Sequence, residues 1–95
     1  MLYLTEETIR EHLRWEALVR AIETAVRRED VVVPRRLSFD LGSTTAASPG
    51  RLLIMPSWQA ESTIGIKTVT YRPDNARLGL PSHGANYIVM NARSG

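Results

Sequence analysis

The chain has 95 residues, the size of one small domain, and such a domain buries only about 60 to 65% of the surface of its unfolded chain. Its formal net charge of +2, from 12 Lys+Arg and 10 Asp+Glu, does not indicate a nucleic-acid-binding protein. The absence of cysteine excludes disulfides and thiolate metal ligands, and it is typical of a reducing compartment, so we expect a cytoplasmic protein. No basic stretch is followed by a long apolar run, so the sequence predicts neither a signal peptide nor a membrane span.

The first thirty residues have the spacing of two amphipathic helices. Thr5 is a suitable N-cap, and two glutamates follow it in the first turn, where the helix dipole favours negative charge. We expect a helix over residues 6–13, interrupted near Trp15. Apolar residues four positions apart then predict a second helix over about residues 15–29, namely Leu18, Ile22 and Val26.

From Val31 onward the sequence predicts extended structure, because Pro34 disfavours a helical conformation in the residue before it. Alternating or continuous apolar residues predict strands in four segments, which are 37–41, 51–55, 64–71 and 85–93. Two helices followed by about four strands joined by short loops indicate an α+β fold with an antiparallel sheet.

The connections between these strands are rich in proline, glycine and small polar residues. We expect Pro56 to end the second strand, with a connection over residues 57–63. Residues 42–50 and 72–84 are expected to be loops, the second of which holds charges, turn residues and a histidine.

Lys67 is the only lysine of the chain, and it lies in a predicted strand that is apolar on both faces. One interpretation is a guard against aggregation, since lysine is common on edge strands. The other is a partly desolvated amine that faces a pocket, where it could bind a carboxylate, hold an imine or transfer a proton. Gly65 lies on the same face two residues earlier, and we expect it to leave room for a ligand.

Arg35 and Arg36 stand at the entrance of the first predicted long strand, so their side chains point to opposite faces. The one on the buried side is a candidate bidentate clamp for a substrate carboxylate. The alternative is a pair of solvated arginines.

The two histidines are far apart in the sequence. His83 follows Ser82, but adjacency in the sequence is not the geometry of a nucleophile and its base, and no Gly-x-Ser-x-Gly motif is present. We expect His12 to be an exposed helix residue. No closely spaced set of histidines and carboxylates predicts a metal site.

Several short motifs occur in one order along nearly the whole chain, and together they resemble the N-terminal part of the ornithine cyclodeaminase and mu-crystallin family. The motifs are Leu4-Thr5-Glu6-Glu7, Pro34-Arg35-Arg36-Leu37, Leu52-Leu53-Ile54-Met55-Pro56-Ser57-Trp58, Gly65-Ile66-Lys67-Thr68-Val69-Thr70, Pro73-Asp74-Asn75, Gly79-Leu80-Pro81-Ser82-His83-Gly84 and Ala92-Arg93-Ser94-Gly95. Each motif is weak alone, and the ordered set is specific.

The resemblance implies an enzyme that uses NAD(H) or NADP(H) on amino acids or cyclic imino acids, by deaminating cyclisation or imine reduction. Residues 1–95 would be part of the substrate-binding and dimerisation domain, which predicts a homodimer. By motif, Lys67 would be the catalytic lysine and Arg36 the residue that holds the substrate carboxylate. Met55 and Ser82 would be neighbouring pocket positions, with Arg35 as a second clamp candidate and His83 beside the pocket.

The nucleotide-binding Rossmann domain is absent from this sequence, which has no Gly-x-Gly-x-x-Gly motif. We therefore expect no cofactor to bind this chain alone, and we expect it to be inactive alone. The turn residues Ser94 and Gly95 at its end are typical of a piece of a longer protein.

Two further interpretations stay open at the level of sequence. The chain could be a stand-alone, non-catalytic binding or dimerisation module that retains the family sheet. It could also be an unrelated α+β domain whose basic loop binds an anion. Neither a nucleic acid nor a membrane is expected as a partner.

Overall fold

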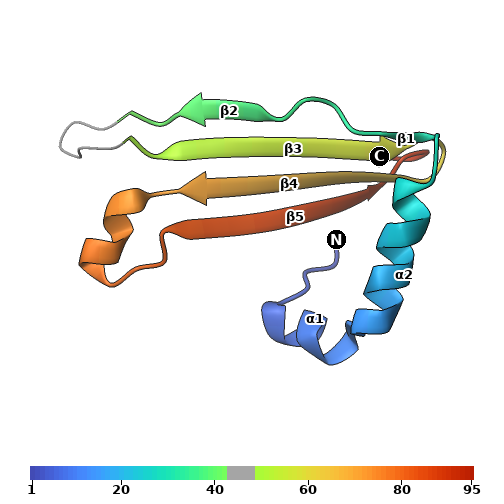
Figure 1. Ribbon diagram of the computed structural model, residues 1–95, viewed down its shortest axis with the longest axis horizontal. Helices are drawn as coiled ribbons and strands as arrows, with labels where there is room; N and C mark the ends of the chain where they lie inside the picture. The colour runs from blue at the N-terminus through green and yellow to red at the C-terminus, as the bar shows by residue number, and fades with distance from the viewer. Residues whose placement is uncertain (43–48) are drawn as a thin grey trace.

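The predicted α+β fold is confirmed by the structure, a computed structural model that describes residues 1–42 and 49–95 (Figure 1). Its helices are α1 (Glu6–His12), α2 (Trp15–Val26) and the 3-10 helix η1 (Pro73–Leu78). Its strands are β1 (Val31–Val32), β2 (Leu37–Asp40), β3 (Arg51–Gln59), β4 (Thr63–Tyr71) and β5 (His83–Asn91). Most of the loop predicted over 42–50, residues 43–48, lies outside the described residues.

The two N-terminal helices begin and end for local reasons. The Thr5 side chain accepts a hydrogen bond from the Thr8 backbone N–H at 3.2 Å, as expected of an N-cap. The α2 helix ends at Val26, three residues earlier than predicted. The residues after it are held in a turn by a hydrogen-bonded pair between Arg28 and Asp30 instead of continuing the helix.

All strand pairs are antiparallel, and the order in the sheet is β1-β3-β4-β5, with β2 paired to β3 next to β1. The β4 strand pairs along its whole length with β3 on one side and β5 on the other. It is therefore a central strand, while β5 forms an edge of the sheet. The strand ends differ from the predicted ones by one or two residues, except at Pro56.

The prediction that Pro56 ends its strand is wrong, because β3 continues to Gln59. On one side, β3 pairs with β2 through residues 51–54 and with β1 through Trp58 and Gln59. Pro56 lies in the gap between these two pairings. A proline is tolerated there because its missing N–H removes no hydrogen bond to β1 or β2.

The loop predicted over 72–84 contains η1. Pro73 stands in the first turn of this 3-10 helix, where its fixed φ is favourable, and Gly79 ends it in a left-handed conformation with φ of 69°. The Asn75 side chain donates to the Pro81 carbonyl at 2.9 Å. These contacts return the chain to β5.

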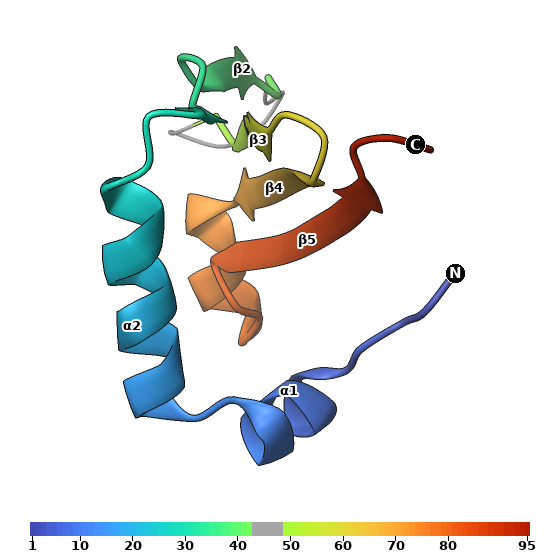
Figure 2. The same cartoon turned by 90° about the vertical axis from the view of Figure 1, so that its right-hand side faces the viewer.

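The elements form an open layer in place of a closed core. Among the described residues no apolar side chain is fully buried. The radius of gyration is 16.5 Å, against about 12 Å for a compact domain of this length. Extensive contacts between elements occur between neighbouring strands, and α1 and α2 form an arm beside the sheet (Figure 2).

The strand register divides the sheet into two faces of different character. We call one the apolar face; Thr68, Thr70 and Asn86 also lie on it, and its apolar members include Leu37, Phe39, Leu52, Ile54, Pro56, Trp58, Ile64, Ile66, Ile88 and Met90. We call the other the lysine face, which contains Arg51, Leu53, Met55, Ser57, Gln59, Thr63, Gly65, Lys67, Val69, Tyr71, His83, Ala85, Tyr87, Val89 and Asn91. Phe39 and Ile88 are 48% and 49% exposed, so the apolar face is uncovered in this chain.

A polar clamp joins the end of α2 to the sheet. The Arg28 guanidinium donates to both Asp30 carboxylate oxygens at 2.8 Å, and the Gln59 side-chain amide donates to one of them at 3.0 Å. The hydrogen bonds from Arg28, the largest cause, lower the pKa of Asp30 to about 2. Asp30 thus links the helical arm to β3 through its ionised form.

Replacing Arg28 with alanine should raise the pKa of Asp30 toward the ordinary aspartate value of about 3.9. Since the pKa is lowered in the folded state, the clamp stabilises the fold above pH of about 4 and is lost as the pH falls toward about 2. Carbon-13 NMR titration of the Asp30 carboxyl measures this shift. Arg27→Ala is the control, and equal titration of Asp30 in the wild type and in Arg28→Ala would contradict the assignment.

Candidate functional site

Lys67 lies at the middle of the central strand β4, opposite Met55 on β3 and Tyr87 on β5. The interpretation of Lys67 as an edge-strand guard is therefore wrong, because β4 is paired on both sides. The side chain is exposed on the lysine face. Its amine is available to a ligand on this face of the sheet.

Arg36 belongs to the same row of residues by register. It directly precedes β2, in which Leu37 pairs with Ile54. Extending the β2 register by one residue would put Arg36 opposite Met55, which pairs with Lys67, whereas the β1 register, in which Val32 pairs with Trp58, would put Arg35 there. Since residues 33–36 are unpaired and the register shifts by one residue between β1 and β2, Arg36 takes the lysine face, and Arg35 the other, only when the β2 register is extended.

We call Arg36, Met55, Lys67 and Tyr87 the cross-sheet row. Met55, Lys67 and Tyr87 lie on β3, β4 and β5, and Arg36 directly precedes β2. The row thus contains two cations with an apolar side chain between them. Neighbouring strands lie about 4.8 Å apart, so Arg36 and Lys67 are two strand spacings from each other at the backbone, about 10 Å. Long side chains at that separation can converge on one small anion.

The space beside Lys67 differs from what the sequence suggested. We expected Gly65 to leave room for a ligand, but the phenol of Tyr87 fills that room. A Cβ on Gly65 would lie 3.0 Å from the Tyr87 ring carbon Cζ and would overlap the hydroxyl oxygen. Gly65 is buried beneath the aromatic ring. The sequence did not reveal this contact, because residues 65 and 87 are far apart along the chain.

Ser82 and His83 lie at the start of β5, opposite the last residue of β4 and away from the cross-sheet row. His83 pairs with Tyr71, four residues from Lys67, which is about 13 Å along a strand. The imidazole is tilted against the Tyr71 ring, with centroids 4.7 Å apart, and its Nδ1 hydrogen-bonds the Ser82 hydroxyl at 3.0 Å. These residues form a separate polar pair on the same face.

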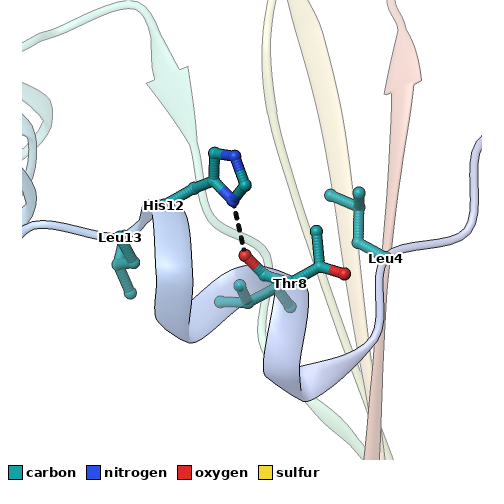
Figure 3. A pocket seen from close by; sticks show the side chains of 5 residues that line it. Leu4, Thr8, His12 and Leu13 are labelled. Atoms are coloured by element: carbon teal, nitrogen blue, oxygen red, sulfur yellow. Dashed lines mark hydrogen bonds between the residues drawn. The ribbon is translucent and has the colours of Figure 1, made fainter.

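The hollow shown in Figure 3 lies on α1 and the segment before it, and none of its lining residues belongs to the sheet. Its volume is about 430 Å³, and it is lined by Leu4, Thr8, Ile9, His12 and Leu13. His12 is exposed, as predicted, and its Nδ1 hydrogen-bonds the Thr8 carbonyl at 2.9 Å. The hollow is mainly apolar and lacks the paired charges of the cross-sheet row.

Two further observations concern partners. Within residues 1–42 and 49–95, no group of three or more histidines, cysteines or carboxylates is arranged to hold a metal ion. In the same part of the chain, no helix is both long enough and apolar enough to span a membrane.

The comparisons identify the family. Residues 1–95 match the ornithine cyclodeaminase/mu-crystallin family. The chain belongs to this family. The predicted resemblance is confirmed, and the interpretation as an unrelated α+β domain is wrong.

Three curated relatives match nearly the whole chain. An uncharacterized protein of Schizosaccharomyces pombe is 34% identical over 95 residues, which are 98% of this chain and 28% of the relative. Protein SAR DEFICIENT 4 of Arabidopsis thaliana is 29% identical over 98% of this chain and 29% of its own length. A Delta(1)-pyrroline-2-carboxylate reductase of Colwellia psychrerythraea is 29% identical over 100% of this chain and 30% of its own length.

Two solved structures share the fold at low sequence identity. The Thermococcus litoralis Delta(1)-pyrroline-2-carboxylate reductase in complex with NADH and L-proline superposes with a TM-score of 0.83 at 24% identity. The superposition covers 100% of this chain and 29% of the reductase chain. An archaeal alanine dehydrogenase dimer with bound NAD has a TM-score of 0.81 at 24% identity, over 97% and 28% of the two chains. The chain thus spans less than a third of the length of its relatives.

The contact between Gly65 and Tyr87 predicts strong coupling in a double-mutant cycle. Gly65→Ala should cost about 1 to 3 kcal/mol in the wild type, because the added Cβ overlaps the phenol, and clearly less in a Tyr87→Ala background. Urea unfolding of the four proteins measures the coupling free energy. Gly84→Ala is the control, since its Cβ would meet only the Thr70 hydroxyl, at 3.1 Å. Additive costs would show that the ring does not cover Gly65.

Proposed function

We propose that this chain supplies the carboxylate clamp and the catalytic lysine of an NAD(P)-dependent enzyme that acts on amino acids or cyclic imino acids. The reaction is a deaminating cyclisation or the reduction of an imine. The observation that carries the proposal is the position of the only lysine, central in the sheet and paired with Met55, with Arg36 directly before the strand that pairs beside Met55.

The clamp in this proposal is Arg36. A guanidinium binds a carboxylate through two parallel hydrogen bonds, which fixes the orientation of the ligand as well as its position. With the α-carboxylate on Arg36, the α-carbon and its nitrogen extend across Met55 toward Lys67. The Met55 side chain provides an apolar surface between the two cations. Arg35, on the opposite face, is the weaker candidate for holding the carboxylate.

The catalytic role falls to Lys67. Its amine can donate a hydrogen bond or a proton to the imine nitrogen or carbonyl oxygen, where charge changes during the reaction. Two cations near one anionic substrate favour the charge distribution of the transition state. Ser82 and His83 are proposed as outer polar positions of the site, because His83 pairs with Tyr71, four residues from Lys67.

The relatives support the substrate class. Their names include Delta(1)-pyrroline-2-carboxylate reductases and an alanine dehydrogenase, and the Thermococcus litoralis structure holds L-proline and NADH. Pyrroline-2-carboxylate, L-proline and alanine each carry a carboxylate on the carbon that bears the amine or imine nitrogen. This is the ligand pattern that an arginine and a lysine in one row can recognise.

We propose that residues 1–95 are part of a substrate-binding and dimerisation domain, and that NAD(H) or NADP(H) is held by a Rossmann domain outside these residues. The sequence has no Gly-x-Gly-x-x-Gly motif with which to bind a pyrophosphate. Because the chemistry of hydride transfer belongs to the cofactor, this chain alone is expected to be inactive.

A homodimer is the proposed assembly, in the cytoplasm. The apolar face is uncovered and continuous over four strands, and a sheet face of this kind is normally buried against another layer. The same face supports the second candidate function, a non-catalytic dimerisation module that retains the sheet. That module needs the apolar face but does not need the cross-sheet row.

Calorimetric titration of this chain with L-proline, pyrroline-2-carboxylate, L-ornithine and NAD(H) tests the proposal. Arg36→Ala should weaken binding of the carboxylate ligands by about 10- to 100-fold, the value of a charge-assisted hydrogen-bonded contact. Lys67→Ala should also weaken it. Arg35→Ala is the matched control, because it removes the neighbouring guanidinium from the opposite face and should leave affinity within about twofold.

The outcomes separate the two candidates. Amino-acid or imino-acid binding that is lost in both variants, without nucleotide binding, supports a detached substrate domain. A folded dimer that binds none of the ligands supports the dimerisation module, and equal losses in Arg35→Ala and Arg36→Ala would refute the assignment of the clamp.

A further inference from the structure

Tyr87 occupies a position next to Lys67 that none of the sequence motifs singled out. It pairs directly with Lys67 across β4 and β5, and both residues belong to the lysine face. Its ring extends diagonally along the sheet and covers Gly65, two residues before the lysine. The Tyr87 side chain therefore starts opposite Lys67 and ends over Gly65.

We infer that Tyr87 determines substrate size: its ring forms a wall beside Lys67 that admits small α-keto, α-imino or α-amino acids and excludes those with bulky substituents. The inference rests on the proposed role of Lys67 as the residue that meets the reacting carbon and nitrogen. Tyr87 is here a specificity-determining residue, and it needs no part in the chemical step.

The neighbours of Lys67 on the lysine face single out Tyr87 for this role. The other residues that surround Lys67 on this face lie on the same strand or a neighbouring one, at most two residues further along. Their side chains are smaller than that of tyrosine; they are Leu53, Met55, Ser57, Gly65, Val69, Ala85 and Val89. Tyr71, on β4, is the other tyrosine on this face, and it lies four residues from Lys67, against His83. A ligand at Lys67 thus meets one rigid aromatic group, on the Gly65 side.

A purely structural role would also explain an aromatic ring over a glycine, since such cover protects the bare backbone of a strand. Tyr87 is, however, 62% exposed. One part of the ring covers Gly65, and the remainder is free to meet a ligand. The two roles differ in one measurable respect, because only a wall changes which molecules reach the Lys67 amine.

The sequence offers an unusually clean probe of that access. The only primary amines of the chain are Lys67 Nζ and the N-terminus at Met1. An α-keto acid condenses with an amine to form an imine, with a new carbon–nitrogen bond and loss of the carbonyl oxygen as water. Cyanoborohydride then delivers hydride to the imine carbon and makes the adduct permanent. Mass spectrometry of peptides gives the labelling of Lys67 relative to Met1, and Met1 serves as the reference within each molecule.

Pyruvate and phenylpyruvate are the probes, because they differ by one phenyl ring. In the wild type, the Lys67-to-Met1 labelling ratio should be about tenfold lower with phenylpyruvate than with pyruvate. Tyr87→Val, which keeps a strand-forming residue, should abolish most of this difference, and Tyr87→Phe should retain it. Tyr71→Val is the matched control and should behave as the wild type. If Tyr87→Val loses the circular dichroism of the sheet, Tyr87→Leu replaces it in the same comparison.

Equal discrimination in the wild type and in the smaller Tyr87 variants would overturn the inference, and so would a Tyr87→Phe variant that resembles Tyr87→Val. The labelling measures access to Lys67, whereas the titrations measure ligand affinity. Failure of the proposed function therefore appears as absent ligand binding, and failure of this inference appears as labelling that does not depend on Tyr87.

Discussion

The antiparallel pairing of β3, β4 and β5 is the constraint on which the rest of the structure depends. Each of these strands has nine residues, and β4 is paired over its full length on both sides. Because side chains alternate between faces with a period of two, a slip of one residue would move Lys67 to the apolar face. The register thus places the Lys67 amine and the Tyr87 phenol on the same face of the sheet.

The same pairing leaves the sheet open, and this connects its stability to its function. Backbone hydrogen bonds hold the layer together, while the described residues contain no fully buried apolar side chain. The apolar face needs a covering layer, and the lysine face needs access for a ligand. A dimer over the first face and a pocket over the second satisfy both requirements, which is why the proposed assembly and the proposed site do not compete for one surface.

Much of the fold and part of the site could be predicted from residues alone. The N-cap at Thr5, the period of the helices and the alternation of the strands are local features, and they predicted α1, most of α2 and four of the five strands, without β1. The ordered motifs indicated the family. The extension of β3 through Pro56 was missed, because whether a proline breaks a strand depends on what lies beside it.

The sequence by itself determined the composition of the site: one lysine, a pair of arginines at a strand entrance, and a glycine near the lysine. Only the tertiary structure decided that Lys67 is central and that Tyr87 fills the space above Gly65. The physical reason is that strand order and cross-strand contacts join residues distant in the sequence. Local patterns specify which face a residue takes within its own strand, but not which residue of another strand it meets.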